Sequence, residues 1–204
     1  MIGIIFATLM EANPFLKKTC AQKIETRLFT IYMADMSENG EKIIICICGM
    51  GKVAAALATQ KLICNYKIKA VINAGICGSL IAECKTKELF LISSALEGDL
   101  KEFGKLSAPY LCDNKFFTGM KKASLVTCDA PVFDSAIKKN FAKLADLVDM
   151  EGASVARTAS MYGMPCMLVK GVTDIANSKS RVELKQNLNE VSEKIAQTLI
   201  NYLF

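Results

Sequence analysis

Short apolar runs alternate with helical patterns along the whole 204-residue chain. Runs of β-branched residues predict strands, and apolar residues at steps of three and four predict amphipathic helices. Most of the strands are apolar on both faces, so helices must cover the sheet above and below. The pattern therefore predicts an α/β protein, with strands at 2–6, 28–33, 42–48, 69–74, 88–93, 124–127, 146–149 and 166–170 and helices at 52–64, 151–162 and about 182–203.

The organisation of the chain is simple. No internal repeat, linker or low-complexity segment interrupts the pattern, so we expect residues 1–204 to form one domain. The stretch 94–120 is the least regular, and we expect a mobile loop there. The N-terminus lacks a basic region, and no uninterrupted apolar run is long enough to span a bilayer; we expect neither a signal peptide nor a membrane partner.

Composition narrows the chemistry. The chain contains no histidine, which excludes a Ser-His-Asp triad, a Cys-His pair and a His-ligated zinc site. Proton transfer near neutral pH must then use carboxylates, Lys, Tyr or Cys with shifted pKa values. The nine cysteines are odd in number, form no C-x-x-C and lie partly within apolar runs. This usage favours a reducing cytoplasmic location and argues against a metal or redox role.

The net charge of +5 does not indicate a nucleic-acid partner. The basic residues are almost all lysines, dispersed along the chain without interleaved aromatics. A nucleic-acid surface normally concentrates its basic residues in one patch and stacks bases on aromatic side chains. We therefore expect these lysines to be solvated surface residues.

Polar and glycine-rich segments follow several predicted strands. Glu11 follows the first strand, and the segments GMGK, NAGICGS, DMEG and KGVTD, at 49–52, 73–79, 149–152 and 170–174, follow later ones. Functional residues of an open α/β sheet gather outside the carboxyl ends of its strands. We expect these segments to meet at one edge of the sheet.

The GMGKVA segment formally matches a dinucleotide-binding fingerprint. That reading requires an acid at the end of the next strand, which instead ends in Val71, Ile72 and Asn73. The segment is also not a phosphate-binding Walker loop, which requires the pattern G-x-x-x-x-G-K followed by Ser or Thr. Here Val53 follows Lys52, and the two glycines are too close together. We expect no cofactor; a loop that approaches a ligand closely and a plain tight turn both remain open.

Four acids at the ends of predicted strands give a more specific hypothesis. Asp149 and Glu151 lie where a strand gives way to a helix and could simply cap that helix. Asp174 follows an apolar strand among small residues, and it either caps the next turn or faces a ligand. If Glu11 meets Glu151 and Asp174, their carboxylates suit cleavage of a bond to an anomeric carbon, which needs an acid, a water-activating base and a group on the sugar hydroxyls.

Taken together, these motifs resemble the nucleoside phosphorylase superfamily, and within it the methylthioadenosine/S-adenosylhomocysteine nucleosidases, over essentially the whole chain. The resemblance implies a three-layer α/β/α sandwich with a central mixed sheet, a homodimer, and hydrolysis of a 5′-modified adenosine to release adenine. It implies that Glu11 activates the water, that Glu151 binds the ribose hydroxyls and that Asp174 donates toward N7 of the purine. The implied substrate-binding residues are Met50, Gly78, Val132, Met150 and Thr173, with Thr173 orienting the acid that follows it.

Departures from the family pattern leave the substrate open. The chain is shorter between about residues 96 and 124, the region that supplies a partner-subunit loop over the 5′ end of the substrate. No arginine lies in a glycine loop, so water is favoured over phosphate as the nucleophile. Hydrolysis of aminodeoxyfutalosine or futalosine, as in menaquinone synthesis, is one alternative. A nucleoside-binding protein with little catalytic activity is another.

Overall fold

The computed structural model describes residues 1–35, 41–102, 105–113 and 116–204. Its strands are β1 Ile2–Phe6, β2 Gln22–Glu25, β3 Thr30–Asp35, β4 Lys42–Ile47, β5 Val71–Ser79, β6 Leu89–Glu97, β7 Lys101–Glu102, β8 Lys105–Leu106, β9 Tyr110–Leu111, β10 Lys122–Thr127, β11 Leu147–Asp149 and β12 Cys166–Asp174. Its helices are α1 Leu9–Lys18, α2 Lys52–Asn65, α3 Ser135–Phe141, α4 Gly152–Met161 and α5 Ser180–Leu203.

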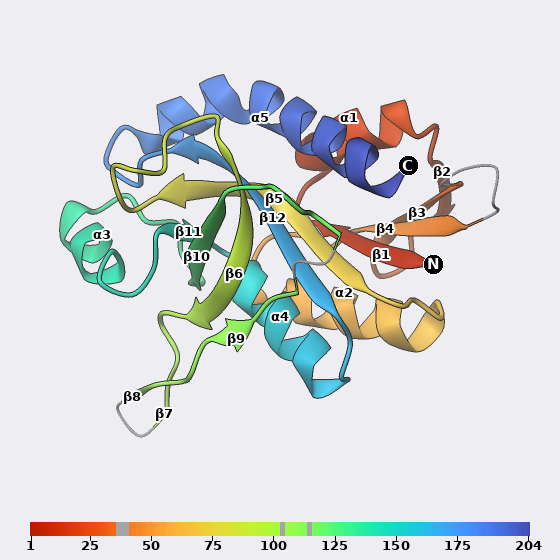
Figure 1. Cartoon of the computed structure of the whole chain (residues 1–204), viewed down its shortest axis with the longest axis horizontal. Coiled ribbons are helices and arrows are strands. Elements are labelled where there is room, and N and C mark those ends of the chain that lie inside the picture. The colour runs from red at the N-terminus through yellow and green to blue at the C-terminus, as the bar shows by residue number, and fades with distance from the viewer. Residues whose placement is uncertain (36–40, 103–104, 114–115) are drawn as a thin grey trace.

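These elements form three layers. The helices α1 and α5 cover one face of the sheet, and α2 and α4 cover the other (Figure 1). Alternate residues of β1 supply both interfaces: Ile4 and Phe6 pack with Phe15 of α1, whereas Ile5 packs on the opposite face with Leu62 of α2. The strands are apolar on both faces because each face is covered by helices.

The sheet is mixed, with the strand order β11-β10-β6-β12-β5-β1-β4-β3-β2. The strands β4, β1, β5 and β12 run parallel to one another, whereas β12 and β6 are antiparallel. A further antiparallel pairing joins β11 to β5 through Leu147 with Ser79 and Val148 with Gly78. This pairing closes one half of the sheet on itself and brings the end of β11 beside β5. The predicted α/β/α fold with a mixed sheet is confirmed.

Two segments that are predicted to follow strands belong to the strands themselves. Residues 75–79 continue β5 beyond the predicted end at 74, and residues 171–174 continue β12 beyond the predicted end at 170. The parallel pairing of the two strands extends as far as Asp174 beside Gly78. Glycines and short side chains weaken the local strand signal, and here the pairing between neighbouring strands overrides it.

Two helices have no counterpart in the sequence prediction. The helix α1 begins directly after β1 and contains Pro14, which conceals its periodicity. The short helix α3 has no buried residue and therefore no apolar stripe. Of the irregular stretch 94–120, the described residues hold the end of β6 and the short strands β7, β8 and β9; residues 103–104 and 114–115 lie outside the described residues.

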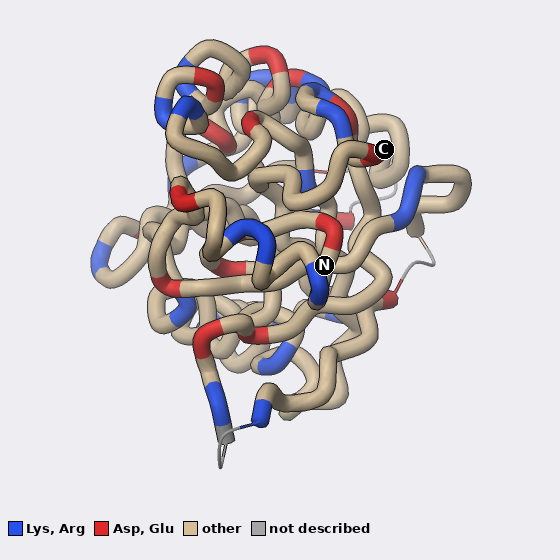
Figure 2. The backbone as a smooth tube through the Cα atoms, turned by 90° about the vertical axis from the view of Figure 1, so that its left-hand side faces the viewer, with Lys and Arg blue, Asp and Glu red and all other residues tan. Residues whose placement is uncertain are grey.

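On the side of the molecule that Figure 2 shows, Lys and Arg positions are scattered along the backbone and interspersed with Asp and Glu. Within the described ranges, no helix is both long enough and apolar enough to cross a membrane.

Candidate active site

A pocket of about 440 Å³ opens at the edge of the sheet where β1, β4, β11 and β12 end. Its volume falls in the range that is usual for small-molecule sites. The predicted site residues all line this pocket: Glu11, Met50, Gly78, Val132, Met150, Glu151, Thr173 and Asp174. The structure therefore brings together residues that lie far apart in the sequence, while their individual roles remain predictions.

Glu11 lies in the first turn of α1, where Thr8 caps the helix. Its Oε2 accepts hydrogen bonds from Thr8 N at 2.8 Å and from Thr8 Oγ1 at 2.7 Å, and its Oε1 accepts one from Ile76 N at 3.0 Å. The carboxylate passes so close to Gly75 that a Cβ on that residue would lie 2.8 Å from Oε1. These contacts hold the Glu11 side chain in place against β5.

Glu151 occupies the N-cap position of α4 but makes no capping hydrogen bond with its side chain. Its Oε1 instead accepts a hydrogen bond from Gly51 N at 2.8 Å, which ties it to the glycine loop. Gly51 has φ +97°, a conformation that favours glycine. Burial, together with the negative charge of Asp149, raises the pKa of Glu151 to about 7. The capping interpretation is therefore wrong for Glu151.

Asp149 does cap α4, and it also forms a buried ion pair. Its Oδ2 accepts a hydrogen bond from Gly152 N at 2.8 Å and lies 2.7 Å from Lys170 Nζ. Burial opposes the charge of Lys170, but Asp149 and Glu151 outweigh that effect and raise its pKa. The sequence analysis assigns no role to Lys170. Its position inside an apolar strand is the feature that could identify it as a member of an ion pair, because a buried lysine needs a carboxylate partner.

Asp174 combines both interpretations offered by the sequence. Its Oδ1 accepts a hydrogen bond from Ala176 N at 2.9 Å, so it stabilises the turn after β12. Its Oδ2 accepts a hydrogen bond from Thr173 Oγ1 at 3.0 Å, and the side chain also lines the pocket. Thr173 Oγ1 lies 3.3 Å from the carbonyl of Cys77 as well, so its hydroxyl has a second acceptor in reach.

The remaining walls are mainly apolar. The sequence pattern predicts that Leu184 and Leu188 of α5 pack on the sheet, but both also line the pocket. Lys185, between them, lines it too. Met10 and Ile76 also line the pocket, although the sequence analysis assigns neither of them a role in binding. A sequence pattern cannot distinguish apolar pocket residues of this kind from residues of the hydrophobic core.

The site therefore places three carboxylates, each held by a backbone N–H group, around one apolar space. Burial among like charges favours protonation of at least one of them near neutral pH, as the raised pKa of Glu151 illustrates. Such a set can protonate a leaving group, take a proton from water and accept hydrogen bonds from hydroxyl groups.

Comparisons with known proteins agree with this geometry. The chain is 28% identical over 186 residues to the 5′-methylthioadenosine/S-adenosylhomocysteine nucleosidase of Desulfotalea psychrophila, covering 79% of each chain. It is 24% identical over 224 residues to the aminodeoxyfutalosine nucleosidase of Helicobacter pylori, covering 99% of this chain and 96% of that one. A crystal structure of the H. pylori 5′-methylthioadenosine/S-adenosylhomocysteine nucleosidase superposes with a TM-score of 0.91 at 20% identity, over 98% of this chain and 96% of the other.

The family model described as "Phosphorylase superfamily" matches residues 1–203. The match spans the glycine loop, the strands β5 and β12, and the pocket carboxylates Glu11, Asp149, Glu151 and Asp174. By fold and by sequence, the chain belongs to the phosphorylase superfamily.

Proposed function

We propose that this chain is a nucleosidase that hydrolyses the N-glycosidic bond of a 5′-modified adenosine, of the methylthioadenosine or S-adenosylhomocysteine type, and releases adenine. The observation that carries the proposal is the convergence of Glu11, Glu151 and Asp174 on one pocket. The relatives named above act on nucleosides of this class, which supports the same assignment.

In the proposed reaction, the bond between C1′ and the purine nitrogen breaks, and its electron pair goes to the base. Protonated Asp174 gives its proton to N7, which makes the base a better leaving group. As Asp174 becomes a carboxylate, the hydrogen bond from Thr173 Oγ1 stabilises its new charge. Glu11 takes a proton from the water that attacks C1′. The reaction needs no histidine.

Glu151 is the group that would bind the ribose hydroxyls. Hydroxyl donors favour the ionised form of a carboxylate, so a bound sugar would lower the pKa that burial raises. Met150, beside it, would pack on the sugar ring, and Met50, Gly78 and Val132 would line the sugar and base subsites.

Water is the proposed nucleophile. Arginine is the side chain best suited to hold a phosphate, because it binds two oxygens at once, and among the described residues no arginine lines the pocket; the lysine that does, Lys185, lies between two leucines of α5. The test is incubation of the purified protein with methylthioadenosine, S-adenosylhomocysteine and aminodeoxyfutalosine in phosphate-free buffer, with chromatographic measurement of adenine. Release of adenine from at least one supports the proposal; no release from any of them rejects it.

Aminodeoxyfutalosine is the second candidate substrate, and Lys185 is the observation that favours it. This lysine lines the pocket beside two leucines and makes no ion pair with any residue that the structure describes. The 5′ substituent of aminodeoxyfutalosine carries a benzoate, which such a lysine would attract. Lys185→Gln should then raise the KM for this substrate but not for methylthioadenosine. Lys179→Gln, at the N-cap of the same helix but outside the pocket, is the control.

The alternative of a nucleoside-binding protein with little catalytic activity makes a different prediction. Such a protein would bind methylthioadenosine tightly, and Asp174→Asn would leave its rate of adenine release unchanged. The homodimer, which the family resemblance implies, and the cytoplasmic location, which the cysteine usage favours, both stay predictions. Sedimentation of the purified chain tests the first of them.

A further inference from the structure

Lys52 has an unusual position for a lysine. It is the first residue of α2, where the partial positive charge of the helix terminus disfavours a cation, and the first turn of α2 contains no acid to offset it. Its side chain is only 13% exposed and does not line the pocket. The contacts that stabilise the charge of Lys52 must therefore come from outside α2.

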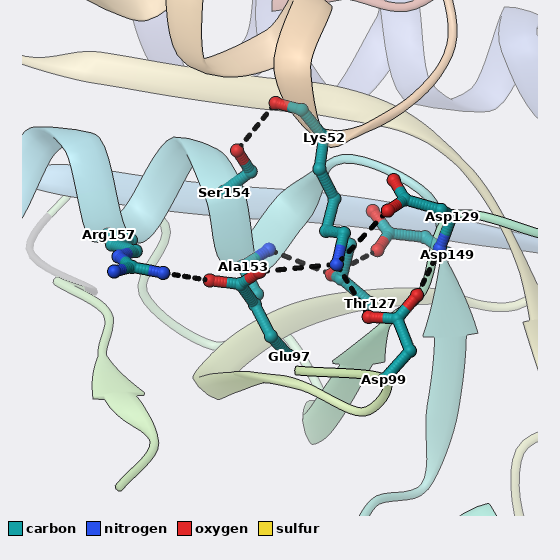
Figure 3. A network of polar contacts seen from close by, with 9 residues as sticks. All are labelled: Lys52, Glu97, Asp99, Thr127, Asp129, Asp149, Ala153, Ser154 and Arg157. Carbon is teal, nitrogen blue, oxygen red and sulfur yellow. Dashed lines mark hydrogen bonds and ion pairs between the residues drawn. The ribbon is translucent and has the colours of Figure 1, made fainter. Parts of the chain in front are cut away.

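Those contacts are carboxylates from neighbouring strand ends. Lys52 Nζ lies 3.3 Å from Glu97, 2.5 Å from Asp99 and 3.3 Å from Asp129 (Figure 3). Glu97 ends β6, and Asp129 follows β10. Without the lysine, these like charges would repel one another. Two described contacts would still offset part of this repulsion: Arg157 lies 2.8 Å from Glu97, and Asp129 N donates a hydrogen bond to Asp99.

The cluster is bonded to both sides of the pocket. On one side, Asp99 Oδ2 accepts a hydrogen bond from Asp129 N at 2.7 Å, immediately before residues 131–133, which form a wall of the pocket. On the other side, the carbonyl of Lys52 accepts a hydrogen bond from Ser154 Oγ at 2.7 Å. Gly51, the residue before Lys52, is bonded to Glu151. Lys52 thus joins the glycine loop to the wall at 131–133.

We propose that Lys52 is a positioning residue that holds the pocket wall at residues 131–133 against the glycine loop and thereby sets the affinity for the nucleoside. This inference rests on the proposed function, because it concerns the same pocket. Lys52 touches no reacting atom; it acts through Asp99 and Asp129. The side chain of Lys52 is 13% exposed and that of Asp99 33%, so solvent screens this contact less than it screens an ion pair between two fully exposed groups, whereas Asp129 is 62% exposed and its contact with Lys52 is screened more.

The protonation states support this arrangement. Burial disfavours the charge of Lys52, but its hydrogen bond and ion pair with Asp99 outweigh that effect and raise its pKa. The pKa of Asp99 is lowered, since the contact with Lys52 and the hydrogen bond from Asp129 N together outweigh its burial. Both groups stay charged across the physiological range.

The test compares Lys52→Met, Lys52→Arg and a control, Lys61→Met, by steady-state kinetics. Lys61 is on the same helix and forms a comparable, partly buried ion pair with Glu25, but it lies outside the pocket. The wall would contact substrate and transition state alike, so Lys52→Met should raise KM about tenfold while kcat changes less than about threefold. Lys52→Arg should recover most of the loss, and Lys61→Met should leave KM unchanged.

Equal KM values for Lys52→Met and the wild type overturn the proposal, as does an equal rise in Lys61→Met. If Lys52→Met does not fold, Asp99→Asn replaces it, because an amide oxygen can still accept from Asp129 N. Binding of adenine, measured by calorimetry, separates this inference from the proposed function. A wild-type protein that binds adenine but hydrolyses no nucleoside rejects the function alone; binding that is the same in wild type and variant rejects the inference.

Discussion

Lys170 and Asp149 form an ion pair of 2.7 Å in which each side chain is 1% exposed. The pair joins β12 to β11, at the point where β11 leads into Glu151. Asp149 also accepts hydrogen bonds from Thr127 Oγ1 and Gly152 N, so its buried charge is fully compensated. The same pair supplies the opposing charges that act on the pKa of Glu151.

Removing one member of this pair should be costly. Lys170→Met leaves the Asp149 carboxylate buried without its cation, and we expect the free energy of unfolding to fall by about 3 to 5 kcal/mol. Urea denaturation measures this loss. The double variant Lys170→Met/Asp149→Asn should regain more than half of it, since no uncompensated charge remains. A single variant as stable as the wild type would show that the pair contributes nothing.

Stability should depend on pH through Glu151. Its pKa is about 7 in the folded chain, against an ordinary value of 4.5. Between these values the folded chain holds a proton that the unfolded chain releases. The contribution of Glu151 to the free energy of unfolding is therefore fully present below 4.5 and is lost as pH rises through 7. This pH-dependent contribution to the free energy of unfolding is at most about 3 kcal/mol.

Denaturation of wild type and Glu151→Gln at roughly pH 5 and pH 8 measures this contribution. The wild type should lose more stability than the variant on going to the higher pH. The same pH dependence in both proteins would contradict the raised pKa.

Asp174→Asn should remove most activity without unfolding the chain. The loss of a proton donor lowers kcat by about 100- to 10,000-fold, while the amide oxygen can still accept from Ala176 N. Asp146→Asn is a matched control, because Asp146 also binds a backbone N–H and a hydroxyl, both of Ser124, yet lies outside the pocket. Retention of wild-type kcat by Asp174→Asn would reject the role of Asp174.

Gly75→Ala should move the Glu11 carboxylate. The new Cβ would lie 2.8 Å from Glu11 Oε1, which is the end of a flexible side chain and can shift. We expect kcat to fall about 10- to 100-fold with little loss of stability, because small displacements of a reacting group are costly. Gly119→Ala serves as the comparison. The new Cβ would meet open space, but φ is +84°, a backbone conformation that alanine disfavours. Stability should therefore fall, whereas kcat should not change. An unchanged kcat in Gly75→Ala contradicts the placement of Glu11 in the reaction.

Much of this site could be predicted from the sequence. The isoleucine-rich strands identify the sheet, and the parallel strands β1 and β12 bring their carboxyl ends to one edge, so Glu11 and Asp174 are predicted to meet there. Glu151 reaches the same pocket for another reason, because the antiparallel pairing of β11 with β5 places the end of β11 there. The glycine loop could be located but not interpreted, because its role depends on the hydrogen bond from Gly51 to Glu151, 100 positions away in sequence.

The remaining features depend on contacts that no local pattern records. The pairing of β11 with β5, the burial of Lys170 and the contribution of α5 to the pocket all arise from packing between distant segments. The sequence pattern does not predict α1, because Pro14 interrupts its short amphipathic pattern. Such features follow from tertiary structure, which overrides local propensity.

The central claim is tested most directly by measuring adenine and free sugar together after incubation with methylthioadenosine, S-adenosylhomocysteine and aminodeoxyfutalosine. In phosphate-free buffer we predict that at least one nucleoside gives adenine and a reducing sugar in equal amounts, and that added phosphate changes neither. Failure to cleave any of the three, or cleavage only when phosphate is added, would contradict the assignment of this pocket as a nucleosidase site.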